Sequence, residues 1–127
     1  MPIAIDTTQT SEYVLRSERQ EDGSPRQDAT VFILRPITSR EFARCMQVKE
    51  INGSGAAPIQ CVRHGLAGVR GFRDGKGAVV DLATRKGLLG VEVTDAFMDR
   101  LAMSWVIELS DEITRLNQIS EGEEKNS

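Results

Sequence analysis

The chain has 127 residues and a net charge of −3, and its content of 39% hydrophobic and 28% charged residues is typical of one globular domain. Four Phe, one Trp and one Tyr predict a mostly aliphatic core. No apolar run approaches the ~18 residues of a membrane span, and the first ten residues do not resemble a signal peptide, so we expect an intracellular protein with no membrane partner.

Charge is unevenly distributed along the sequence. Residues 40–91 hold nine bases and four acids, a net charge of +5, whereas residues 92–127 hold nine acids and three bases, a net charge of −6. This contrast is compatible with head-to-tail self-association or a charged partner, but we favour two ordinary solvated surfaces. The overall pI near 5.2 argues against nucleic acid as a partner.

The first third of the chain predicts an antiparallel hairpin. Residues 1–10 are polar and are expected to form a loose arm. Strand-forming residues at 12–19 and 29–36 flank the turn-forming cluster "EDGSPRQD" at 21–28. Pro36 ends the second strand because it cannot donate to a ladder.

A capped helix is expected at 39–50. Thr38 followed by Glu41 has the spacing of a capping box, and Ile37 before the cap suggests a hydrophobic staple with the fourth helical residue. The helical residues expected to face inward are Phe42, Cys45 and Met46.

A second amphipathic helix is predicted after Pro58. Its apolar positions are Ile59, Val62, Leu66 and Val69. Glycines at every third position, 65, 68 and 71, are expected to fray it. Beyond it we predict a turn at 74–77, a short strand at 78–82 and a linker at 83–93.

The last predicted helix begins at Thr94, with Asp95 in its first turn. Its apolar residues are Phe97, Leu101, Trp105, Leu109, Ile113 and Leu116, with Val106 and Ile107 beside or behind them. Apolar residues over more than one face of the helix indicate either a long central helix or a helix with a face for a partner. The pattern stops at Ile119, so residues 120–127 are expected to form an acidic, disordered tail.

Motifs for catalysis or metal binding are absent from the sequence. His64 is the single histidine, and with Cys45 and Cys61 it lacks a zinc-site spacing. The two cysteines are expected to be small buried thiols, and "GFRDGKG" is neither a phosphate-binding loop nor a calcium loop. We therefore expect no enzymatic activity, cofactor or metal.

Together these elements predict an α+β fold: a hairpin packed with three to four helices, of which the C-terminal one is long. The globular core is expected to span residues 11–119. Candidate partner-binding residues are Phe97, Leu101, Trp105, Val106, Ile107, Leu109, Arg63, Arg70 and Arg73.

Three stretches resemble phage tail assembly chaperones, small tail-module proteins of long-tailed phages. They are "VFILRPITSREF", "GLAGVRGFRDGKGAVVDL" and "AMSWVIELSDEITRLNQISEGEEKNS". The resemblance implies a protein of the host cytoplasm that binds the tape-measure protein, keeps its apolar helices from aggregating and recruits tail-tube subunits. A homo-oligomer is also expected. The alternatives are a small virion protein, such as a head–tail connector component, and a phage-encoded module that binds a host protein.

The resemblance also gives meaning to the residues Glu124-Lys125-Asn126. They can be encoded as GAA-AAA-AAC, on which a ribosome can slip back by one base. The resembled family often makes a longer second product by such a slip near the end of this gene. The alternative, which we favour slightly, is a plain charged terminus.

Overall fold

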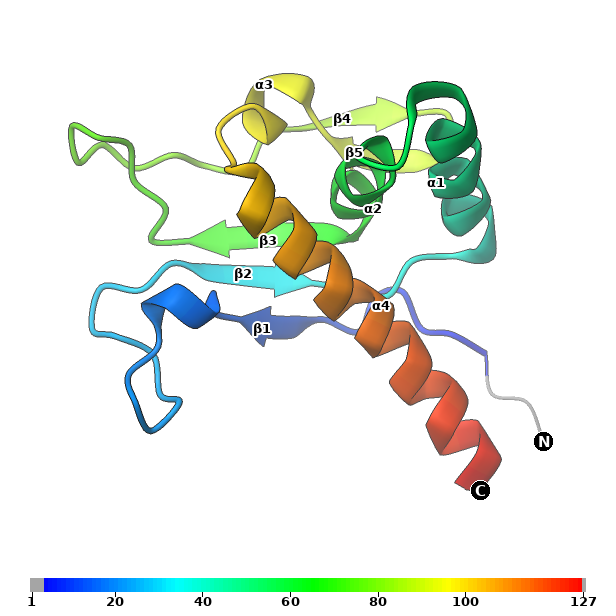
Figure 1. Ribbon diagram of the computed structural model, residues 1–127, viewed down its shortest axis with the longest axis horizontal. Helices are drawn as coiled ribbons and strands as arrows, with labels where there is room; N and C mark the ends of the chain where they lie inside the picture. The colour runs from blue at the N-terminus through cyan, green and yellow to red at the C-terminus, as the bar shows by residue number, and fades with distance from the viewer. Residues whose placement is uncertain (1–3, 127) are drawn as a thin grey trace.

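The computed structural model describes the backbone of residues 4–126 and the side chains of residues 4–118. It has the expected α+β class, with a three-stranded sheet, a second small sheet and helices packed around them (Figure 1). Residues 4–10 contain no helix or strand and are largely exposed.

The main sheet confirms the predicted hairpin and adds a strand. Its antiparallel order is β1 (Ser11–Tyr13), β2 (Val31–Leu34) and β3 (Leu66–Arg70). Phe32 and Leu34 are fully buried while their neighbours in β2 are half-buried, as alternation along a strand requires. The first predicted strand is shorter than expected, because the chain leaves the sheet for the 3₁₀ turn η1 (Arg16–Glu18).

Helix α1 (Ser39–Asn52) begins with the predicted capping box. Glu41 N donates to Thr38 Oγ1 at 3.1 Å, and Thr38 N donates to Glu41 Oε1 at 2.9 Å. Cys45 is buried as expected, but Phe42 is 57% exposed and Met46 is 40% exposed, so their predicted inward positions were wrong. Glu41 occupies the inward position instead, which turns Phe42 outward by about 100°.

Helix α2 (Ala56–Gly65) is shorter than predicted because the chain enters β3 at Leu66. Residues 66–70 pair with β2, so their apolar side chains belong to a strand. Gly65 stands at the junction, where a Cβ atom would lie 2.5 Å from Ile113 Cδ1. The glycine thus allows a close approach to the C-terminal helix rather than fraying α2.

Residues 84–93 form a hairpin that sequence reasoning took for a linker. Strands β4 (Thr84–Gly87) and β5 (Gly90–Val93) pair in an antiparallel register. The predicted turn before them is present, with Gly77 N donating to Asp74 O at 3.0 Å. The strand predicted at 78–82 is not formed, and that segment makes one isolated bridge between Arg73 and Val79.

The predicted C-terminal helix is divided in two. Thr94 caps α3 (Asp95–Met98), and after a break the long helix α4 (Met103–Asn126) begins. The backbone is helical to Asn126, so residues 120–126 do not form the expected disordered tail; Ser127 lies outside the described residues. Their content of Glu and Lys, which are good helix formers, is consistent with the longer helix.

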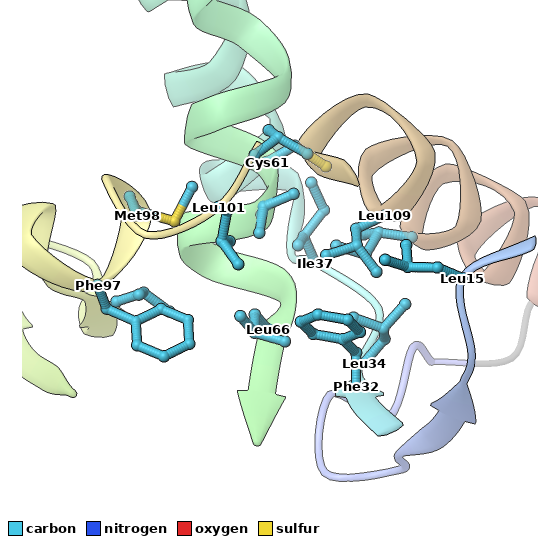
Figure 2. Packing of buried hydrophobic residues seen from close by; sticks show 14 of the residues in the cluster. Leu15, Phe32, Leu34, Ile37, Cys61, Leu66, Phe97, Met98, Leu101 and Leu109 are labelled. Atoms are coloured by element: carbon cyan, nitrogen blue, oxygen red, sulfur yellow. The ribbon is translucent and has the colours of Figure 1, made fainter. Parts of the chain in front are cut away.

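The core lies between the main sheet, α2 and α4. Figure 2 shows Phe32 and Leu34 from β2 meeting Leu66 from β3 and Leu109 from α4. Tyr13 Oη also donates to Glu108 Oε2 at 2.6 Å, which ties β1 to α4. Helix α4 therefore covers the sheet as a central core helix.

Candidate protein-binding groove

The apolar residues predicted to bind a partner are mostly core residues. Those that are buried are Phe97, Leu101, Val106 and Leu109. Trp105 is half-buried and packs its ring against Phe72. Ile107 is the member of this set that is clearly exposed, at 46%. The predicted apolar stripe is therefore divided between α3, the break after it and the inner face of α4, and it does not form a continuous surface for a partner.

The three predicted arginines do not form one basic patch either. Arg63 pairs with Asp95, whereas Arg70 pairs with Glu12 across the sheet at 2.6 Å. Arg73 donates to the carbonyl of Gly77 at 3.0 Å within its own turn. Only Arg63 lines the hollow described next.

A groove of about 1000 Å³ lies between α1, α2 and the β4–β5 hairpin. Helix α1 contributes four polar or charged residues to it, together with Ala43 and Val48. Helix α2 contacts both α1 and β5 and forms the floor, and the hairpin forms the opposite wall. Figure 1 shows these elements together at one end of the molecule. Sequence reasoning missed the groove because one of its walls was not recognised as a hairpin.

The groove contains a group of apolar side chains. Val48, Ile59, Leu88 and Leu89 line it. Leu88, at the tip of the hairpin, is 100% exposed. A single exposed leucine is unremarkable, but Leu88 is one of four aliphatic residues that line the same concave surface. This arrangement favours contact with an apolar partner.

Ion pairs within the groove neutralise part of its charge. Arg63 binds Asp95, and Arg85 Nε lies 3.0 Å from Glu92 Oε1. The hydrogen bond and the charge of Arg63 hold the pKa of Asp95 below its usual value. Arg63–Asp95 connects α2 to α3, and Arg85–Glu92 joins the two strands of the hairpin. Arg85 Nη1 also lies 4.0 Å from Asp95 Oδ2, so Asp95 links the hairpin wall to α2 through α3.

A buried polar network lies beneath the groove. Arg35 donates to both Glu41 carboxylate oxygens, at 3.1 and 2.8 Å, and His64 Nδ1 lies 3.5 Å from Glu41 Oε2. His64 is 3% exposed, and its Nε2 lies 2.8 Å from the Gln60 amide nitrogen. With this amide as donor, Nε2 is the acceptor and the neutral ring carries its proton on Nδ1, toward Glu41.

The pKa values of both groups are lowered. Burial lowers the pKa of His64 from its ordinary 6.5, although Glu41 opposes the shift. Burial alone would raise the pKa of Glu41, but hydrogen bonds from Arg35 and from Thr38 N–H outweigh it, so the pKa lies below 4.5. The network therefore combines a carboxylate with a neutral imidazole near neutral pH.

This network predicts a loss of stability in mild acid. Because the unfolded chain binds the His64 proton more readily, the free energy of unfolding should fall as pH decreases from 6.5 toward 4.5. Glu41 remains charged over that interval. Urea unfolding at a series of pH values should show that His64→Gln weakens this dependence. An equal loss in wild type and variant would contradict the assignment to His64.

Cys45 and Cys61 are both buried and unpaired, as expected, but they are also neighbours. A hydrogen bond to Cys61, together with burial, raises the pKa of the Cys45 thiol, which therefore stays protonated. No group of His, Cys, Asp and Glu residues within the described part of the chain is arranged to hold a metal ion. The groove offers surfaces for binding.

Comparisons with family models, with curated proteins and with solved structures find nothing that matches this chain. Of the helices between residues 4 and 126, none combines the length and apolar character needed to cross a bilayer. The groove is therefore the feature from which a function is inferred.

Proposed function

We propose that this chain is a non-enzymatic phage tail assembly chaperone that binds a helical segment of the tape-measure protein and helps tail-tube assembly. The observation that carries the proposal is the groove between α1, α2 and the β4–β5 hairpin, with aliphatic and cationic side chains in one concave surface. The resemblance of the three stretches described above supplies the identity of the partner.

The size of the groove suits a helix. Two turns of helix with a diameter of about 10 Å occupy roughly 850 Å³, which is close to the groove volume of about 1000 Å³. Helices that lie in grooves present apolar residues at i, i+3, i+4 and i+7. Val48, Ile59 and Leu89 offer the aliphatic surface such a face would cover.

Co-expression with the neighbouring phage genes tests the proposal. We expect the chain to co-purify with the product of a long helical reading frame just downstream, and to be missing from purified virions. Leu88→Asp should weaken the complex, since it places a charge on the fully exposed tip of the groove wall. Val79→Asp is the matched control, because Val79 is 56% exposed and lies outside the groove. Stable incorporation into virions would favour the structural alternative instead.

The codons of residues 124–126 give an independent test. A slippery run there, with an open minus-one frame beyond it, would support the chaperone proposal. A coding sequence without the run, or with an immediate stop in that frame, would remove this support and strengthen the virion-protein alternative.

A further inference from the structure

We propose that the groove selects acidic amphipathic helices, with carboxylates spaced one turn apart facing α1 and aliphatic residues facing α2 and the hairpin. This inference rests on the proposed function to the extent that the occupant is a helical segment of another protein. It adds the charge of that segment, which the resemblance to tail chaperones does not supply.

The charge balance of the groove carries the inference. Four arginines and two carboxylates line it. Arg63 and Arg85 lie against the two carboxylates, Asp95 and Glu92. Within the described residues, no ion pair is formed by Arg40 or Arg44, the two arginines that α1 contributes. An occupant therefore meets two uncompensated positive charges along one wall.

The spacing of these two arginines defines the complementary pattern. Arg40 and Arg44 are separated by four residues, which is about 6 Å along α1. Like charges at this spacing repel each other, so an incoming pair of carboxylates relieves repulsion as well as forming ion pairs. A helix running beside α1 presents carboxylates at the same distance when they are also four residues apart.

The aliphatic residues favour a protein over a nucleic acid. Val48, Ile59 and Leu89 would contact the apolar face of a helix but offer a phosphate backbone nothing. An acidic peptide that carries its own apolar face can pair with the arginines of α1 and can also cover the aliphatic residues of the groove.

Binding of designed peptides to the full chain tests the selection. Three labelled peptides of about 18 residues, long enough to form a helix, share one leucine face and carry Glu, Gln or Lys at i,i+4 pairs beside it. Fluorescence anisotropy should give at least about tenfold tighter binding of the Glu peptide than of the Gln peptide, with the Lys peptide weakest. The preference should decrease with added salt because the arginines are exposed.

Charge reversal on α1 is the decisive variant. Arg40→Glu with Arg44→Glu should abolish the preference for the Glu peptide and favour the Lys peptide, while leaving the thermal unfolding transition cooperative. Arg26→Glu with Arg73→Glu changes the net charge equally at exposed positions outside the groove and should leave the preference unchanged.

The other possible outcomes would contradict the charge selection, the groove as a helix site, or the identity of its occupant. Equal binding of the Glu and Gln peptides would overturn the charge selection and leave the proposed function intact. If no amphipathic peptide binds, both the selection and the groove as a helix site fail. Displacement of the Glu peptide by an oligonucleotide, lost on charge reversal, would identify a nucleic-acid groove. Self-association lost on the same reversal would identify a second copy as the occupant.

Discussion

Replacing Glu41 with alanine is expected to lower the free energy of unfolding by about 3–5 kcal/mol, because it leaves a buried cation without its partner. The Glu41 side chain is 5% exposed and that of Arg35 is 19% exposed, so neither group is well solvated. The same carboxylate accepts the hydrogen bond of the Thr38 N–H, and the substitution therefore also opens the capping box. Glu41 thus combines a buried ion pair with a helix cap.

Urea unfolding of three proteins measures this effect. Glu50→Ala removes the same side chain from an exposed position of the same helix and should change stability by no more than about 0.5 kcal/mol. Glu41→Gln retains an acceptor oxygen and the shape of the side chain. Its loss in free energy of unfolding should therefore lie between those of Glu41→Ala and Glu50→Ala. A loss below about 1 kcal/mol for Glu41→Ala would mean that Arg35 finds water or another acceptor in the variant.

The role of Glu41 shows which parts of the fold could be predicted from the sequence. The capping box depends on residues three apart, and its chemistry is fixed locally, so the start of α1 was predicted correctly. The partners Arg35 and His64 depend on how β2, α1 and α2 come together, which no local pattern encodes. Without that information, Phe42 was the natural choice for the inward position, although it is 57% exposed.

The candidate site was harder to predict than the fold. Periodicity identified α4 because its inner face is continuously apolar, and it thereby selected core residues such as Leu109 as a partner surface. Few residues of the β4–β5 hairpin are buried, so its sequence lacks the alternation of apolar and polar residues that predicts a strand. In Thr84–Gly87 three of four residues are exposed, and Val93 is the buried residue of β5. A groove between a polar helix face and such a hairpin leaves no periodic signal in the sequence.

Phe72→Ala is expected to destabilise the protein by about 3–5 kcal/mol, although the sequence pattern did not identify this residue as part of the core. Phe72 is 9% exposed, and its ring contacts three other aromatic rings. The centroid distances are 6.2 Å to Phe32, 5.9 Å to Phe97 and 6.3 Å to Trp105. One side chain thus joins β2, α3 and α4, and its removal leaves a cavity that elements from distant parts of the chain cannot all close.

The same chemical change at Phe42 is the matched control. Phe42 is 57% exposed, so Phe42→Ala should change the free energy of unfolding by no more than about 0.5 kcal/mol. The loss for Trp105→Ala should lie between those for Phe72→Ala and Phe42→Ala, because Trp105 packs against Phe72 from one side and is only half-buried. Urea unfolding monitored by circular dichroism avoids dependence on the single tryptophan. Similar losses for Phe72→Ala and Phe42→Ala would show that Phe72 does not hold the three elements together, and that the core is centred on the β2–α4 contact alone.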